Sequence, residues 1–145
     1  MGRILVIYYS ASGNTRKMAE LVAEGASAEN RHEVKTVEAS GLSTAEFTAA
    51  DGYAFGSPDY FTYMAGQMKT FFDQALPLVG KIKDKPFVTF VTHGGGGDAI
   101  KSLDKLGTAI GLKKVCEGVR SLGAPTKKTV EESRELGGKL ARAVV

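Results

Sequence analysis

Apolar runs and amphipathic stretches alternate along the whole chain. The runs 3–9 and 86–92 are almost entirely apolar, and 52–56 largely so, which predicts strands buried on both faces of a sheet. The runs 32–38 and 113–120 alternate polar and apolar residues instead. Edge strands tolerate such a polar face, so the sequence places these two strands at the sheet edges.

The segments between these runs have apolar residues at helical spacing. Apolar residues three and four apart predict helices over 14–28, along a stripe from Met64 to Val79, over 100–110, and after Pro125. Thr129 and Glu132 form the expected capping pair of the last helix. The segment 41–50 is expected to hold only a short helical turn.

Strict strand–helix alternation predicts an α/β fold, a three-layer α/β/α sandwich around a five-stranded parallel sheet. The apolar strands belong in its centre, which selects the strand order 2-1-3-4-5. At 145 residues, the chain is expected to form a single domain over 1–145. In such sheets, ligands bind beyond the carboxyl ends of the strands, near the switch point between strands 1 and 3.

The loop after the first strand has the chemistry of an anion pocket. It consists of Ser10, Ala11, Ser12, Gly13, Asn14 and Thr15 and leads directly into a helix, whose first N–H groups lack internal partners. Gly13 allows close backbone approach, and the hydroxyls add donors. The Gly-Lys pair of nucleoside-triphosphate loops and the G-x-G-x-x-G of dinucleotide sites are absent from this loop. A phosphate monoester is therefore the expected ligand of this loop.

Two further loops are expected at the same edge. The first packs three aromatic residues into a short segment: Ser57, Pro58, Asp59, Tyr60, Phe61, Thr62 and Tyr63. The second contains four successive glycines, and its candidate residues are Thr92, His93, Gly94, Gly95, Gly97 and Asp98. Exposed aromatic rings can stack on a planar ligand, and a run of glycines lets backbone N–H donors approach the edge of such a ligand. Together the loops predict a planar aromatic ligand bearing a phosphate. Two alternatives stay open: Phe61 as core filler, and the glycine run as a hinge.

Composition excludes several other classes. The formal net charge is +3, with short basic clusters at 81–85 and 127–128 and no aromatics among them, which argues against nucleic-acid binding. Cys116 is the only cysteine, so neither a disulfide framework nor a metal cluster is expected, and core packing is its expected role.

The apolar run at the start is too short for a signal peptide or a membrane span. A cytoplasmic protein without membrane insertion is expected.

The stretch Val6 to Val22, VIYYSASGNTRKMAELV, resembles the FMN phosphate signature of the flavodoxin family, an aliphatic–aromatic pair followed by x-[ST]-x-[ST]-G-N-T. The resemblance extends over the whole chain in element order and length. The loop 121–124 leaves no room for a long insertion, so the chain resembles the short-chain type. The segment Gly56 to Gln74 is also similar to the flavodoxin-like NAD(P)H:quinone reductases.

The resemblance implies that Ser10, Ser12, Asn14 and Thr15 hold the FMN phosphate, and that Ser57 to Tyr63 and Thr92 to Asp98 hold the ring. It implies an electron carrier with no catalytic residues of its own and no metal, working with a reductase and an acceptor protein, as a monomer or weak dimer. Alternatives are an FMN-dependent quinone reductase and a flavodoxin-fold interaction module without flavin.

Two departures from the family stand out. In many flavodoxins a glycine carbonyl in the ring loop turns toward the reduced flavin. Here the position falls at or near Thr62, and a β-branched residue is penalised at positive φ. Flavodoxins are also typically acidic, whereas this chain is basic. We therefore expect partners other than the basic faces that acidic flavodoxins use.

Overall fold

The computed structural model describes residues 2–145, and within them the strands form one parallel sheet. Its order is β2-β1-β3-β4-β5, with β6 also paired to β4. The predicted fold class and the order 2-1-3-4-5 are confirmed. The strands are β1 Gly2–Tyr8, β2 His32–Glu38, β3 Gly52–Pro58, β4 Pro86–His93, β5 Lys113–Lys114 and β6 Val119–Leu122.

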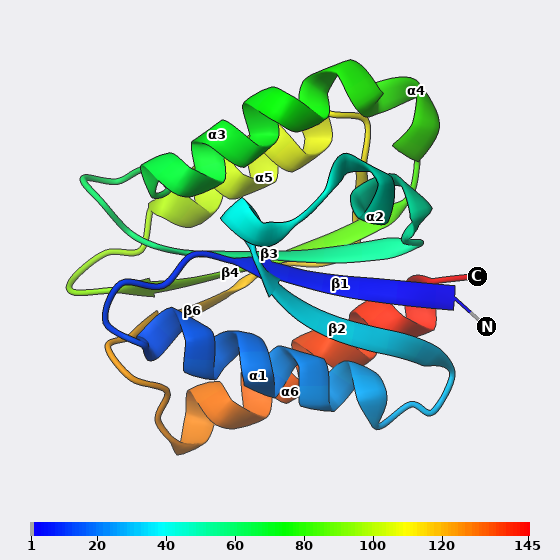
Figure 1. The fold of residues 1–145 in the computed structure, drawn as a ribbon. Helices are drawn as coiled ribbons and strands as arrows, with labels where there is room; N and C mark the ends of the chain where they lie inside the picture. The colour runs from blue at the N-terminus through cyan, green and yellow to red at the C-terminus, as the bar shows by residue number, and fades with distance from the viewer. Residues whose placement is uncertain (1) are drawn as a thin grey trace.

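Helices cover both faces of this sheet (Figure 1). One layer holds α1 and α6, and the other holds α3 and α5 with the short helices α2 and α4. Strands β1, β2, β3, β4 and β6 end toward the same edge, drawn on the left in Figure 1. Strand β5 pairs with the start of β4, and the two ends of the described chain lie at the opposite edge. The helices are α1 Asn14–Ser27, α2 Thr44–Ala49, α3 Gly66–Ala75, α4 Val79–Ile82, α5 Ala99–Ala109 and α6 Lys127–Ala143, with 3-10 turns at Ala39–Gly41 (η1) and Leu76–Leu78 (η2).

Each central strand contributes to two cores because successive side chains point to opposite faces. In β1, Leu5 and Ile7 join a core under α3 and α5, whereas Ile4 and Val6 join a second core under α1 and α6. All four side chains are fully buried. The continuous apolar run of this strand is therefore the consequence of a sheet covered on both sides.

The last predicted strand, 113–120, differs from expectation because it is interrupted. Two short strands, β5 and β6, replace it, and both pair with β4. Between them Gly118 lies so close to β4 that a Cβ atom there would stand 2.4 Å from the carbonyl oxygen of Thr89. The segment 115–118 thus packs against the edge of β4 without continuing the ladder beyond Val115, whose N–H donates to Phe87 O at 3.0 Å.

Two helix predictions need correction. The stripe from Met64 to Val79 is not one helix: α3 ends at Ala75, and a 3-10 turn containing Pro77 redirects the chain into α4. Leu76 and Val79, predicted to face inward, are consequently 55% and 40% exposed.

The capping pair of the last helix is also not the predicted one. Thr126 is the N-cap of α6 and Thr129 its capping-box partner, one turn before Glu132. The Thr126 N–H donates to the Thr129 hydroxyl at 2.7 Å. Thr at the third helical position performs the role that Glu or Gln usually has there.

The helices α1 and α6 approach each other closely because glycines stand at their contact. A Cβ atom on Gly25 would lie 1.8 Å from the carbonyl oxygen of Arg134, and one on Gly137 would lie 1.9 Å from that of Val22. This contact fixes the layer under β1 and β3, and with it the position of the α1 N-terminus at the carboxyl edge.

Candidate functional site

The structure brings the three predicted loops together at the carboxyl edge of β1, β3 and β4 (Figure 1). Hydrogen bonds tie them to one another. The buried hydroxyls of Thr15 and Thr92 lie 2.7 Å apart, joining the first loop to the third. The Asp59 N–H donates to the Thr92 carbonyl at 2.8 Å, joining the second loop to the third. Thr92 is therefore the common anchor of the site.

The first loop presents unpartnered backbone donors. Gly13 has φ +100°, which suits glycine, and its N–H donates to the Ser10 hydroxyl at 3.0 Å. No side chain caps the start of α1. The first amides of this helix therefore remain available, and the helix dipole adds partial positive charge there. The space above Gly13 is open, and Ala11 and Ser12 are exposed. This geometry fits an anion.

The second loop is a tight two-residue turn. Tyr60 and Tyr63 exchange backbone hydrogen bonds, Tyr60 N to Tyr63 O at 2.9 Å and Tyr63 N to Tyr60 O at 3.1 Å. Between them Phe61 and Thr62 both have positive φ, +55° and +68°. A carboxylate oxygen of Asp59 accepts the Thr62 N–H at 2.8 Å and supports this conformation. Positive φ at both central residues is characteristic of a type I′ turn, which ordinarily favours Asn and Gly.

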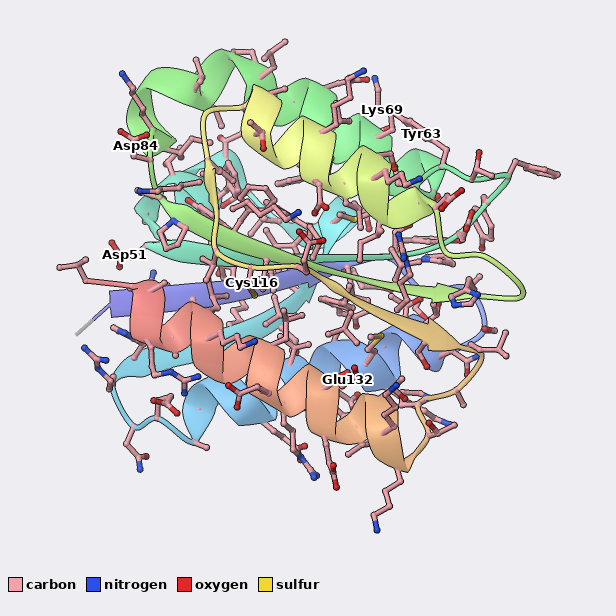
Figure 2. All side chains as sticks on the ribbon, turned by 180° about the vertical axis from the view of Figure 1, so that it is seen from behind. Asp51, Tyr63, Lys69, Asp84, Cys116 and Glu132 are labelled. Carbon is pink, nitrogen blue, oxygen red and sulfur yellow. The ribbon has the colours of Figure 1, made fainter. Side chains whose placement is uncertain are left out.

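The turn holds its aromatic side chains out of the core. Phe61 is fully exposed, so the alternative that it fills the core is wrong. Tyr60 and Tyr63 are each 41% exposed, and Figure 2 shows Tyr63 near Lys69 at this end of the molecule. Partial burial and the neighbouring Tyr9 raise the pKa of Tyr60, so its phenol stays neutral at physiological pH. The three rings offer apolar surface and two phenol hydroxyls that can form hydrogen bonds.

The third loop has a defined turn at its start. The Nδ1 atom of His93 accepts the Gly96 N–H at 2.9 Å, and the His93 carbonyl accepts the N–H of Gly123 at 2.9 Å. Apart from the adjoining residues of the loop, no atom of residues 2–145 lies within 4 Å of where a Cβ atom would stand on Gly94 or Gly95. A flat ligand edge could therefore approach this backbone directly. Asp98 at the end of the loop pairs with Lys101 at 3.6 Å.

Arg120 is a site residue that the sequence analysis missed. Its Nε donates to the Gly97 carbonyl at 3.1 Å, and its side-chain carbons lie against the Gly97 backbone. It is a lone arginine near the end of an edge strand, and only the parallel pairing of β6 with β4 brings it to the glycine loop. The signal that could have found it is its position at a carboxyl end, shared with the other site residues.

Three of the predicted site residues hold the loops in place through internal hydrogen bonds. Ser57 is fully buried, where its hydroxyl donates to Pro58 O at 2.8 Å and accepts the Ala65 N–H at 2.8 Å. These bonds fix the end of β3 and the start of α3. Thr15 and Thr92 are buried at 2% and 5% exposure and bond to each other.

His32 and Cys116 lie away from this edge. The His32 ring accepts the Gly2 N–H through Nδ1 at 3.0 Å, while its Nε2 lies 3.0 Å from the Ala141 carbonyl oxygen. Its role is to tie β1, β2 and α6 together. Cys116 is half-buried beside the core under α6, and burial raises the pKa of its thiol although Lys139 and Lys114 oppose the shift. Figure 2 labels Cys116 near the middle of the view, between the sheet and α6.

Comparisons with known proteins identify the relatives of this chain. A sequence model of the family described as Flavodoxin matches residues 6–137. A flavodoxin from Aquifex aeolicus (strain VF5) is 43% identical over 98 residues, which are 67% of this chain and 53% of that protein. The chain therefore spans about half the length of this curated relative.

Solved structures similar to this chain include a flavodoxin from the domain Archaea, with a TM-score of 0.89 and 28% identity over 97% of this chain and 96% of that one. A flavodoxin, WrbA-like protein from Agrobacterium tumefaciens has a TM-score of 0.83 and 26% identity, covering 98% of this chain and 96% of that one. None of the helices within residues 2–145 has the length and apolar character needed to cross a membrane.

Proposed function

The chain belongs to the flavodoxin family, and from that premise we propose that it binds FMN at the carboxyl edge of the sheet and transfers electrons between proteins. The single observation that carries the proposal is the uncapped start of α1 behind Gly13, facing open space beside exposed rings. When bound, the flavin supplies the redox chemistry, and the fold supplies binding and electrostatics.

Each loop has a part in holding the cofactor. The amides that open α1, with the Ser10, Ser12 and Asn14 side chains, hold the phosphate. The tyrosine-flanked turn and the glycine loop flank the ring, with Tyr60, Phe61 and Tyr63 as the stacking candidates. The neutral phenol of Tyr60 adds no charge next to the ring, and Arg120 keeps the glycine loop in position through Gly97. No group of the protein is required as a catalytic acid or base.

Equilibrium binding of FMN and riboflavin tests the phosphate pocket. We expect FMN to bind and riboflavin to bind far more weakly, since riboflavin lacks the phosphate. Ser12→Glu places a carboxylate in the pocket and should weaken FMN binding at least about tenfold, or ~1.4 kcal/mol, while leaving riboflavin binding unchanged. Ser27→Glu, at the far end of the same helix, is the matched control.

Other outcomes separate the alternatives. A protein that binds neither flavin is an interaction module, and the proposal then fails. Consumption of NAD(P)H by the FMN-loaded protein with a quinone would identify a quinone reductase in place of a carrier. We further propose that the chain works as one domain, in the cytoplasm, as a monomer or weak dimer with a reductase and an acceptor protein.

A further inference from the structure

Positive charge is concentrated at the carboxyl edge of the sheet. Five segments form this edge, 9–17, 38–41, 57–66, 93–101 and 119–129, and together they carry net charge +3. Because the whole chain also carries +3, the remainder is neutral. Arg16 and Lys101 form ion pairs with Glu20 and Asp98. The cations of the edge are Arg16, Lys17, Lys101, Arg120, Lys127 and Lys128, against the three carboxylates of Glu38, Asp59 and Asp98.

Three of the helices that begin at this edge, α1, α3 and α6, have no acidic residue at the N-cap or in the first turn. Helix α5 has Asp98 as its N-cap. Helix dipoles favour anions at these positions and disfavour cations. Lys127 and Lys128 nevertheless open α6, and within residues 2–145 neither makes an ion pair. Their placement opposes helix stability, so folding does not account for it.

An apolar centre lies within this positive edge. Phe61 is fully exposed and Tyr60 and Tyr63 are partly exposed, and Leu122 at the end of β6 is 67% exposed. Leu122 pairs with His93 in the sheet register, which places it beside the glycine loop. An apolar centre surrounded by charged groups is the usual composition of a protein–protein interface.

We propose that this edge docks an acidic electron-transfer protein, whose carboxylates face the cations around an apolar contact at Phe61 and Leu122. The inference rests on the proposed function, since it names the partner chemistry of the same site. The cations come from several segments of one edge that also carries exposed apolar side chains, an arrangement that fits a protein face better than the track of a nucleic-acid backbone. Lys127 and Lys128 open α6, whereas the phosphate pocket is at the start of α1, so we assign them to the partner and not to the cofactor.

Small oxidants of opposite charge test the sign of the field at this edge. Reduced, FMN-loaded protein is mixed with excess hexacyanoferrate(III): two of these anions each take one electron, the flavin returns to its oxidised form, and one proton is released from its hydroquinone anion. We expect this rate to fall at least about threefold between 10 and 200 mM NaCl, because salt screens the attraction. The rate with hexaammineruthenium(III), a cation, should rise.

A pair of charge-reversed variants localises the effect. Lys127→Glu with Lys128→Glu should remove most of the salt dependence with hexacyanoferrate(III) and raise the melting temperature, because the helix dipole favours carboxylates there. At 500 mM NaCl, where the long-range attraction is screened, this variant should bind FMN within about twofold of the parent. Lys81→Glu with Lys83→Glu is the control with the same change in net charge. These lysines lie at the other end of the molecule, where Figure 2 shows Asp51 and Asp84. The control should keep the parent's salt dependence.

Binding of an acidic peptide to the oxidised, FMN-loaded protein tests the docking surface directly. Hexaglutamate peptide titrated into the ¹⁵N-labelled, FMN-loaded protein should shift amide resonances of Leu122, Gly123, Lys127 and Lys128 first. Stronger binding of a seven-nucleotide oligothymidylate, whose six phosphodiesters match the charge of hexaglutamate, at 150 mM NaCl would overturn the proposal in favour of nucleic acid. Equal loss of salt dependence in both variant pairs, or a large loss of FMN affinity at 500 mM NaCl in the Lys127 and Lys128 variant, would overturn it as well. Failure of FMN to bind the parent protein would instead contradict the proposed function.

Discussion

Thr62 shows a single residue held in a conformation that its side chain disfavours. A β-branched residue at φ +68° costs on the order of 1–3 kcal/mol, and the turn keeps it there through the Tyr60–Tyr63 bonds and the Asp59 carboxylate. Thr62→Gly removes this strain, although the glycine recovers about 0.5–1 kcal/mol of freedom in the unfolded chain. We expect a net stabilisation of about 1 kcal/mol in urea unfolding of the flavin-free protein.

A substitution at the neighbouring Asp59 tests how much its carboxylate stabilises the strained backbone of Thr62. Asp59→Ala deletes the acceptor of the Thr62 N–H and should destabilise the protein by about 1 kcal/mol. If Thr62→Gly were also destabilising, the side chain of Thr62 would contribute more than its backbone strain costs.

Thr15 and Thr92 are a second case at residue scale, because their buried hydroxyls bond to each other. Replacing either residue by Val leaves the other hydroxyl without this partner, and should cost about 1–2 kcal/mol in urea unfolding of the flavin-free protein. Since the second substitution removes that orphaned hydroxyl, the double variant should be about as stable as either single one. Strictly additive losses would contradict a direct coupling between the two loops.

Among the elements, the contact between α1 and α6 depends on glycines that have no room for a methyl group. Gly25→Ala or Gly137→Ala would drive a Cβ atom into a backbone carbonyl, and separating the helices should cost about 3 kcal/mol or more. Gly80→Ala is the matched control, because it lies in a helix with open space around it and should be neutral or slightly stabilising. Thermal unfolding monitored by circular dichroism measures all three. A small loss at Gly25 would mean that the helices can part without cost.

The local spacing of apolar residues predicted most strands and helices, because each element buries one or both faces in a core and that burial sets the period of its apolar residues. The prediction was wrong where a specific contact overrode the pattern. Apolar spacing continued the third helix through Pro77, but the proline turned the chain and exposed Val79. Alternation continued the last strand through Gly118, but the close approach to Thr89 interrupted the ladder. Contacts between segments distant in sequence leave no trace in local periodicity.

The site was predictable to the level of its loops. Sheet topology alone assembles segments that follow different strands, which is why three loops could be placed at one edge. The sequence did not reveal that Phe61 lies outside the core, because an aromatic residue in a loop can be exposed or buried and its identity does not indicate which. It also did not reveal Arg120, whose contact with Gly97 requires the pairing of β6 with β4.

For the whole molecule, the distribution of charge matters more than its total. Because the edge that contains the phosphate pocket carries net charge +3, part of the FMN affinity should be long-range attraction to the phosphate dianion. At separations of about 15 Å, this attraction is on the order of 1 kcal/mol in 10 mM salt and vanishes near 500 mM. We therefore expect FMN binding to weaken roughly fivefold over that range of NaCl, measured by quenching of flavin fluorescence. Riboflavin has no phosphate and should bind with nearly constant affinity. An FMN affinity independent of salt would mean that the pocket holds its anion by local hydrogen bonds alone, with the surrounding cations left free for a partner.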